Sequence, residues 1–312
     1  MDEVGTIFTD QRHLERMRGQ AQGFSFLPRQ PVRSLLSGRH ASRIRGRGLD
    51  FEELRHYRIG DDVRSIDWRV TVRTGKPHVR VYTEERERPV LVLVDQRRNM
   101  FFGSQVRMKS VVAAEVSALA AWRVVDVTDR VGGIVFNERE ISMIRPERSR
   151  HTVRRFLGEV SRFTQMLAEQ QPSDEPPSQT LASVLARAEQ VCNHDHLVIL
   201  ISDFDGWDEG CLRRLQRITR HNNLIAGLVF DPLERELPEA SSMVVSDGGA
   251  RQLEVSAAKG RLARAFTESF QSSVDTIEAE LRKFGVPVLP LQTVDPAAAQ
   301  IRQSLGKLEA LR

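Results

Sequence analysis

Two aspartates at the ends of apolar runs have the type and position to bind a cation. Asp95 directly follows Val90–Val94, and Asp203 directly follows His196–Ser202. A short unbroken apolar run predicts a strand that is buried on both faces, as at the centre of a parallel sheet. Open α/β sheets bind their ligands beyond the carboxyl ends of the strands. We therefore expect the two carboxylates to face each other in a crevice at that edge.

The segments around these two runs alternate between helical and strand patterns from residue 89 onward. Helices are expected over residues 106–125, 148–169, 180–192, 212–220, 262–284 and 296–311. Further strands are expected over residues 130–136, 140–145, 223–230 and 286–289, and the first two should form a hairpin around Asn137. Strands that alternate with helices indicate an α/β fold with a doubly wound, mostly parallel sheet.

The chain before this sheet is predicted to be a separate, Arg-rich part, so that residues 1–88 and 89–312 are the two expected domains. Its structure should be partly irregular and partly β. A half-exposed strand is expected at His78–Thr83, because Val79 and Val81 alternate with polar neighbours. One or two helical turns are expected at Leu49–His56.

A dense mixture of Asp and Arg lies just before that strand. The candidate residues of this signature segment are Gly60, Asp61, Asp62, Arg64, Asp67 and Trp68. Paired carboxylates can do acid–base chemistry. Bidentate Arg–carboxylate pairs that fix an irregular segment are the favoured interpretation, and Trp68 is expected to be a core anchor.

The excess positive charge of the chain, +4 in total, is concentrated in its amino-terminal part. Arg29–Arg47 contains six arginines and no carboxylate. This stretch could bind an acidic partner such as nucleic acid or an anionic surface. It could equally be a solvated arm that pairs with the protein's own acidic groups.

Several functional classes are disfavoured by what the sequence lacks. Cys192 and Cys211 are the two cysteines, too few for a disulfide framework. The first residues have no pattern of a secretion signal, and the apolar runs are too short to span a membrane, so a cytoplasmic location is expected. We find no P-loop, serine elbow or Cys–His pair in context, and we expect no enzymatic activity.

The alternation from residue 89 onward resembles the von Willebrand factor A domain. That family carries a metal-ion-dependent adhesion site, formed by an Asp-x-Ser-x-Ser run, a later Thr and a further Asp. The resemblance places these positions, and hence a binding crevice, at Asp95, Arg97, Asn99, Thr180 and Asp203.

The metal motif is degenerate in this chain. Arg97 and Asn99 stand where the family has serines, and an arginine offers no acceptor and always carries charge. We therefore expect no metal cofactor and predict that the Arg97 guanidinium takes the place of the cation. Magnesium at Asp95, Asn99, Thr180 and Asp203 is the alternative.

A second resemblance is more specific. The stretch from Gly46 to Asp95, and above all Gly46–Asp67, closely resembles the signature of a bacterial family of unknown function. Its members join this segment to a von Willebrand A-like domain and are typically encoded beside MoxR-type AAA+ ATPases. The resemblance implies an adaptor or co-factor protein for such an ATPase. The alternatives are an anion or nucleic-acid binder through Arg29–Arg47 and a metal-dependent adhesion-type module.

Overall fold

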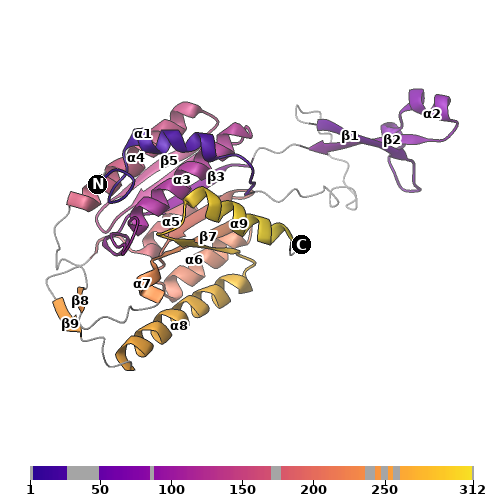
Figure 1. The fold of residues 1–312 in the computed structure, drawn as a ribbon. Coiled ribbons are helices and arrows are strands. Elements are labelled where there is room, and N and C mark those ends of the chain that lie inside the picture. Colours follow the sequence, from indigo (N-terminus) through magenta and orange to yellow (C-terminus); the bar gives the residue numbers. More distant parts are fainter. Residues whose placement is uncertain are drawn as a thin grey trace. The chain divides into compact units, whose positions relative to one another are not determined.

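The 312-residue chain divides into two units in a computed structural model (Figure 1). The larger unit comprises Met1–Leu27 with Arg88–Arg312, and the smaller one, here called the hairpin unit, comprises Pro28–Glu87. The structure describes residues 3–26, 49–84, 88–169, 177–235, 243–246, 252–255 and 261–310. One boundary lies next to the expected one at residue 88, but the first residues of the chain belong to the larger unit.

A six-stranded sheet forms the centre of the larger unit, in the order β10-β7-β6-β3-β4-β5. Its strands are β3 (Val90–Asp95), β4 (Val131–Phe136), β5 (Ile141–Glu147), β6 (Leu197–Ser202), β7 (Asn223–Phe230) and β10 (Val288–Gln292). All neighbours are parallel except β4 and β5, which form the expected antiparallel hairpin. The prediction of an α/β fold with a mostly parallel sheet is confirmed.

The strand β3 shows why the sheet has apolar layers on both sides. Val90, Val92 and Val94 belong to one hydrophobic cluster, whereas Leu91 and Leu93 belong to the other. Successive side chains of a strand point to opposite faces, so an unbroken apolar run can fill two cores.

Helices cover both faces of this sheet (Figure 1). One layer contains α1 (Gln11–Arg16), α3 (Lys109–Asp126), α4 (Arg150–Glu169) and α9 (Ala297–Ala310). The other contains α5 (Leu181–Val191), α6 (Glu209–Thr219) and α8 (Arg261–Lys283). The short helix α7 (Pro232–Arg235) follows β7, and a small antiparallel hairpin joins β8 (Met243–Ser246) to β9 (Gln252–Val255). Within the described part of the chain, no helix is long and apolar enough to cross a membrane.

The first residues pack on the larger unit because they complete its core. Leu14 of α1 and Met17 of the 3-10 helix η1 (Met17–Gln20) are buried in the cluster that also contains α3, α4 and α9. The indole of Trp122 donates a hydrogen bond of 3.2 Å to the Leu14 carbonyl. An apolar face of this kind is buried wherever it finds a complementary core, whatever the distance along the chain.

The hairpin unit is built on two antiparallel strands, β1 (Leu49–His56) and β2 (His78–Glu84). The expectation of helical turns at Leu49–His56 was wrong. Glu52, Glu53 and Leu54 favour helix locally, but the ladder with β2 decides the structure, as non-local pairing often does for strands.

Between the two strands lie a short 3-10 helix, η2 (Val63–Ser65), and the helix α2 (Trp68–Thr74). The Asp67 side chain accepts hydrogen bonds from the first backbone amides of α2, and Gly75 ends the helix with a φ of +70°. A left-handed residue at this position is the usual end of a helix and suits glycine.

Candidate functional site at the carboxyl edge of the sheet

The sheet has a topological switch point between β3 and β6, where the strand order reverses. The two strands are adjacent and parallel, with Val94 paired to Ile201. Asp95 ends β3 and Asp203 follows β6, so both lie at the edge where open α/β sheets bind their ligands. The structure thus brings together the two aspartates singled out in the sequence.

Asp95 is fully buried, and both oxygens of its carboxylate accept hydrogen bonds. The Arg97 guanidinium donates two hydrogen bonds to it, from Nε to Oδ1 at 3.0 Å and from Nη2 to Oδ2 at 2.7 Å. The Ser202 hydroxyl donates a further hydrogen bond of 2.6 Å to Oδ2. Bidentate, charge-assisted bonds are among the strongest in proteins.

Arg97 also reaches toward the end of β6. Its Nη2 donates to the Asp205 carbonyl at 3.0 Å and lies 3.8 Å from Oδ1 of Asp203. Burial alone would lower the pKa of Arg97, but the Asp95 carboxylate, with Asp203, outweighs this and raises it. The guanidinium is therefore a permanent cation between the two aspartates.

A second cation, which no sequence pattern indicated, completes the site. The Lys109 ammonium donates hydrogen bonds to Asp203 at 3.0 Å and to Glu234 at 2.7 Å, and the residue is 2 % exposed. Burial would lower its pKa, but the charges of Asp203 and Glu234 raise it. Burial likewise would raise the pKa of Asp203, and Lys109 reverses this so that the pKa is lowered. The carboxyl-edge cluster thus consists of Asp95, Arg97, Lys109, Ser202, Asp203 and Glu234.

Three elements hold Lys109 and its partners in place. Lys109 is the first residue of α3, a helix whose remaining turns are mostly buried. Glu234 lies in α7 and accepts a hydrogen bond of 2.8 Å from the backbone amide of Asp231. Asp231 follows β7 and is bound by the hydroxyls of Ser104 and Thr293, each at 2.5 Å. Polar contacts therefore continue along the edge from β3 to β10.

The cluster does not suit a divalent metal ion. The best oxygen ligands, on Asp95 and Asp203, are already bound by a guanidinium and an ammonium. An ion placed between them would be repelled by both cations at a distance of a few ångströms. Among the described residues, no group of three or more His, Cys, Asp and Glu side chains could hold a metal ion.

The two other residues of the expected crevice do not join the cluster. Asn99 is exposed in the short 3-10 helix η3 (Arg98–Met100). Thr180 is exposed and caps α5, where its hydroxyl accepts a hydrogen bond of 3.3 Å from the Ser183 amide. The site is a closed cluster in which two cations, Arg97 and Lys109, pair with three carboxylates. Asp95 and Arg97 are both buried.

The signature segment forms two Arg–carboxylate pairs within the hairpin unit. Arg55 binds Asp61 through two hydrogen bonds, of 2.7 and 2.8 Å, which lower the pKa of Asp61 to about 2. Arg80 donates to Asp67 from Nε at 2.8 Å. Both pairs connect residues of the hairpin and fix the loop between its strands.

The remaining signature residues shape that loop. Asp62 accepts a hydrogen bond from the Arg64 amide and caps η2, and Gly60 adopts a φ of +108°, which L side chains rarely adopt. The expectation that Trp68 is a core anchor was wrong, because its side chain is 65 % exposed. The basic stretch Arg29–Arg47 lies outside the described residues.

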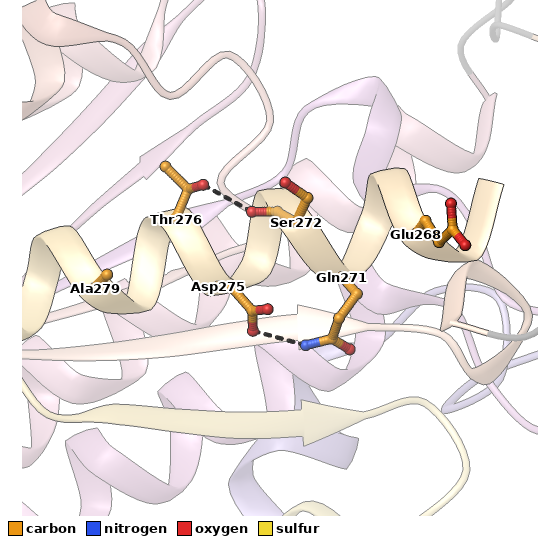
Figure 2. Close-up of a pocket in the computed structure, with 6 residues that line it drawn as sticks. All are labelled: Glu268, Gln271, Ser272, Asp275, Thr276 and Ala279. Carbon is orange, nitrogen blue, oxygen red and sulfur yellow. Dashed lines mark hydrogen bonds between the residues drawn. The ribbon is translucent and has the colours of Figure 1, made fainter. Parts of the chain in front are cut away.

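A shallow hollow on α8 does not form a second site. It is lined by Glu268, Gln271, Ser272, Asp275, Thr276 and Ala279, which all lie along one stripe of a single helix (Figure 2). Gln271 donates to Asp275 at 2.8 Å, and Thr276 donates to the Ser272 carbonyl at 2.7 Å. These side chains are satisfied within the helix, whereas ligand pockets gather groups from several elements.

The comparisons with known proteins give a family. Residues 53–275 match the family described as "Protein of unknown function DUF58". The chain belongs to this family. It is also 27 % identical, over 271 residues, to an uncharacterized protein of Mycobacterium bovis and to one of Mycobacterium tuberculosis. Each match covers 85 % of this chain and 81 % of the relative.

Proposed function

We propose that this protein is a non-enzymatic interaction module that acts as an adaptor for a MoxR-type AAA+ ATPase. The observation that carries the proposal is the closed carboxyl-edge cluster. At the switch point, where related folds bind ligands, Arg97 and Lys109 neutralise Asp95 and Asp203 from within. A nucleophile, a general base or a metal ligand would need a free group there.

The kind of module is supported by the fold and the signature segment. The β4–β5 hairpin and the position of Asp95 after the central strand agree with the resemblance to a von Willebrand A domain. Domains of this type present a rigid face to other proteins. The ATPase as the partner rests on the resemblance of Gly46–Asp67 to proteins encoded beside such enzymes.

The experiment is a titration of the full-length protein into a purified MoxR-type ATPase from the same genome. We expect a complex on a sizing column and a changed rate of ATP hydrolysis. An unrelated protein of similar net charge serves as the control. An ATPase that is active alone, but neither binds this protein nor changes its rate, would contradict the proposal.

Nucleic-acid binding remains a second candidate because of the charge of Arg29–Arg47. Binding through phosphate contacts falls steeply as salt rises. The test is the affinity for duplex DNA at several salt concentrations. A steep fall of the logarithm of affinity with the logarithm of salt concentration would favour this function. The third possibility, metal-dependent adhesion, is disfavoured by the two internal cations.

A further inference from the structure

The hairpin unit carries apolar side chains that its own described residues do not cover. Trp68 is 65 % exposed, Val72 is 82 % exposed, and Ile59 is fully exposed. Val63 is exposed as well. Isolated exposed apolar residues are common, but four within fourteen positions, one of them a tryptophan, point to an interaction surface.

These side chains are held on a fixed frame. Trp68 and Val72 are one turn apart in α2, so they lie on the same face of the helix. Asp67 caps that helix with bonds of 3.0 and 3.1 Å to the Arg69 and Val70 amides, and Arg80 of β2 holds Asp67 in turn. A preorganised surface loses little conformational entropy when it binds.

The exposed charge around these apolar residues is mainly positive, although Asp62, which caps η2, is also exposed. Arg64, Arg69 and Arg73 are exposed, and no described carboxylate lies within ion-pair distance of them. Two of the nearby carboxylates are engaged, because Asp61 pairs with Arg55 and Asp67 pairs with Arg80. The three exposed arginines outnumber the exposed carboxylate of Asp62, so the surface favours a partner that brings negative charge.

We infer that α2 and the loop before it are a docking surface for a protein with an apolar pocket ringed by carboxylates. Trp68 and Val72 would enter the pocket, and Arg69 and Arg73 would pair with its rim. Tryptophan and arginine are the residue types that contribute most at protein interfaces. This inference rests on the proposed function, because the partner would then be the ATPase.

Two other occupants fit less well. A second copy of the chain would bring a surface of the same positive charge, which opposes association. An anionic membrane would also attract this surface, but α2 has only seven residues, whereas membrane-surface helices usually present a longer apolar face. Each of these two occupants would give its own result in the experiment described below.

The test measures the affinity of the full-length chain for the purified ATPase. Trp68→Ser and the double variant Arg69→Glu with Arg73→Glu should each weaken binding by at least about 10-fold. Met143→Ser and Arg220→Glu are matched controls, because these side chains are exposed on the larger unit. The controls should bind like the wild type, and all variants should keep its melting temperature, since none removes a buried contact.

The outcomes separate the inference from the proposed function. If the wild type binds and the two hairpin variants bind equally well, the inference is overturned and the adaptor function stands. If the wild type does not bind, both fail. Trp68-dependent binding to vesicles of phosphatidylcholine and phosphatidylserine, with no effect on the ATPase, would assign the surface to a membrane. A dimer that dissociates in Trp68→Ser would assign it to self-association and would equally overturn the inference.

Discussion

Lys109, at the start of α3, donates a hydrogen bond of 3.0 Å to Asp203, which follows β6. The same ammonium binds Glu234 of α7, so one buried cation joins three elements that are remote in sequence. Such a contact stabilises the edge of the sheet only while both charges are compensated.

Lys109→Met should destabilise the protein by about 3–5 kcal/mol, because it leaves Asp203 and Glu234 without their cation in a buried site. Denaturant unfolding of the full-length chain measures this. Arg213→Met is the control: Arg213 pairs with Glu209 at 3.1 Å, but both side chains are largely exposed. Its effect should stay within about 0.5 kcal/mol. Equal effects of the two substitutions would mean that the Lys109 contacts contribute no more than a surface pair.

The contribution of this buried pair should depend on pH. The pKa of Asp203 is lowered from its ordinary 3.8, so the folded protein releases this proton more readily than the unfolded chain does. The stabilisation is then present above about pH 4 and is lost as the pH falls through the folded pKa.

In alkali the pH dependence runs the other way, because the stabilisation from Lys109 is lost as the pH rises. The pKa of Lys109 is raised above 10.5, so its contribution is complete below that pH and is lost only as the pH rises further. The difference in unfolding free energy between wild type and Lys109→Met should be constant from about pH 5 to 10 and shrink below about pH 4. A difference that does not change in acid would contradict the assignment.

Magnesium should not stabilise the wild type, because the Arg97 guanidinium binds both oxygens of Asp95. The double substitution Arg97→Ser with Asn99→Ser restores the serines of the metal motif, removes that cation and leaves a hydroxyl two residues from Asp95. Magnesium at 100 times its Kd should then raise the unfolding free energy of the variant by about 3 kcal/mol. Asn99→Ser alone is the control and should not respond, because Arg97 remains. Calorimetric binding of one magnesium by the wild type would refute the prediction.

Asp67 has two roles in the hairpin unit that two substitutions can separate. It caps α2 through its side chain and pairs with Arg80. Asp67→Asn keeps a capping oxygen and loses the charge, whereas Asp67→Ala loses both. Amide hydrogen exchange in α2 should therefore be faster in the Ala variant than in the Asn variant. Equal exchange in the two would show that the cap contributes nothing.

The central sheet could be predicted because its signal is local. The runs Val90–Val94 and Leu197–Ile201 are strand-sized and fully apolar, and burial on both faces follows from that alone. Asp95 and Asp203 at one edge followed from the parallel topology. The role of Arg97 was also expected, because the resemblance to the von Willebrand factor A domain places it at a metal-ligand position beside Asp95.

The rest of the site could not be predicted, because its contacts are non-local. Lys109 lies 94 residues from Asp203 and 125 residues from Glu234, and no spacing links them. A lysine at the start of a mostly apolar helix was the one available signal. For Trp68 the prediction itself was wrong. An aromatic residue type predicts burial, but α2 leaves this side chain exposed.

The packing of the first residues has a consequence for how the chain folds during synthesis. Leu14 and Met17 share a core with Ile301 and Leu305, and Arg302 donates to the Gln20 carbonyl at 2.9 Å. The ribosome makes residues 3–26 well before α3 and α4, the helices that contact α1 and η1. The apolar side chains of α1 and η1 therefore stay uncovered until α3 and α4 have been made. Until then, the apolar face of α1 is a surface on which a chaperone can bind during synthesis.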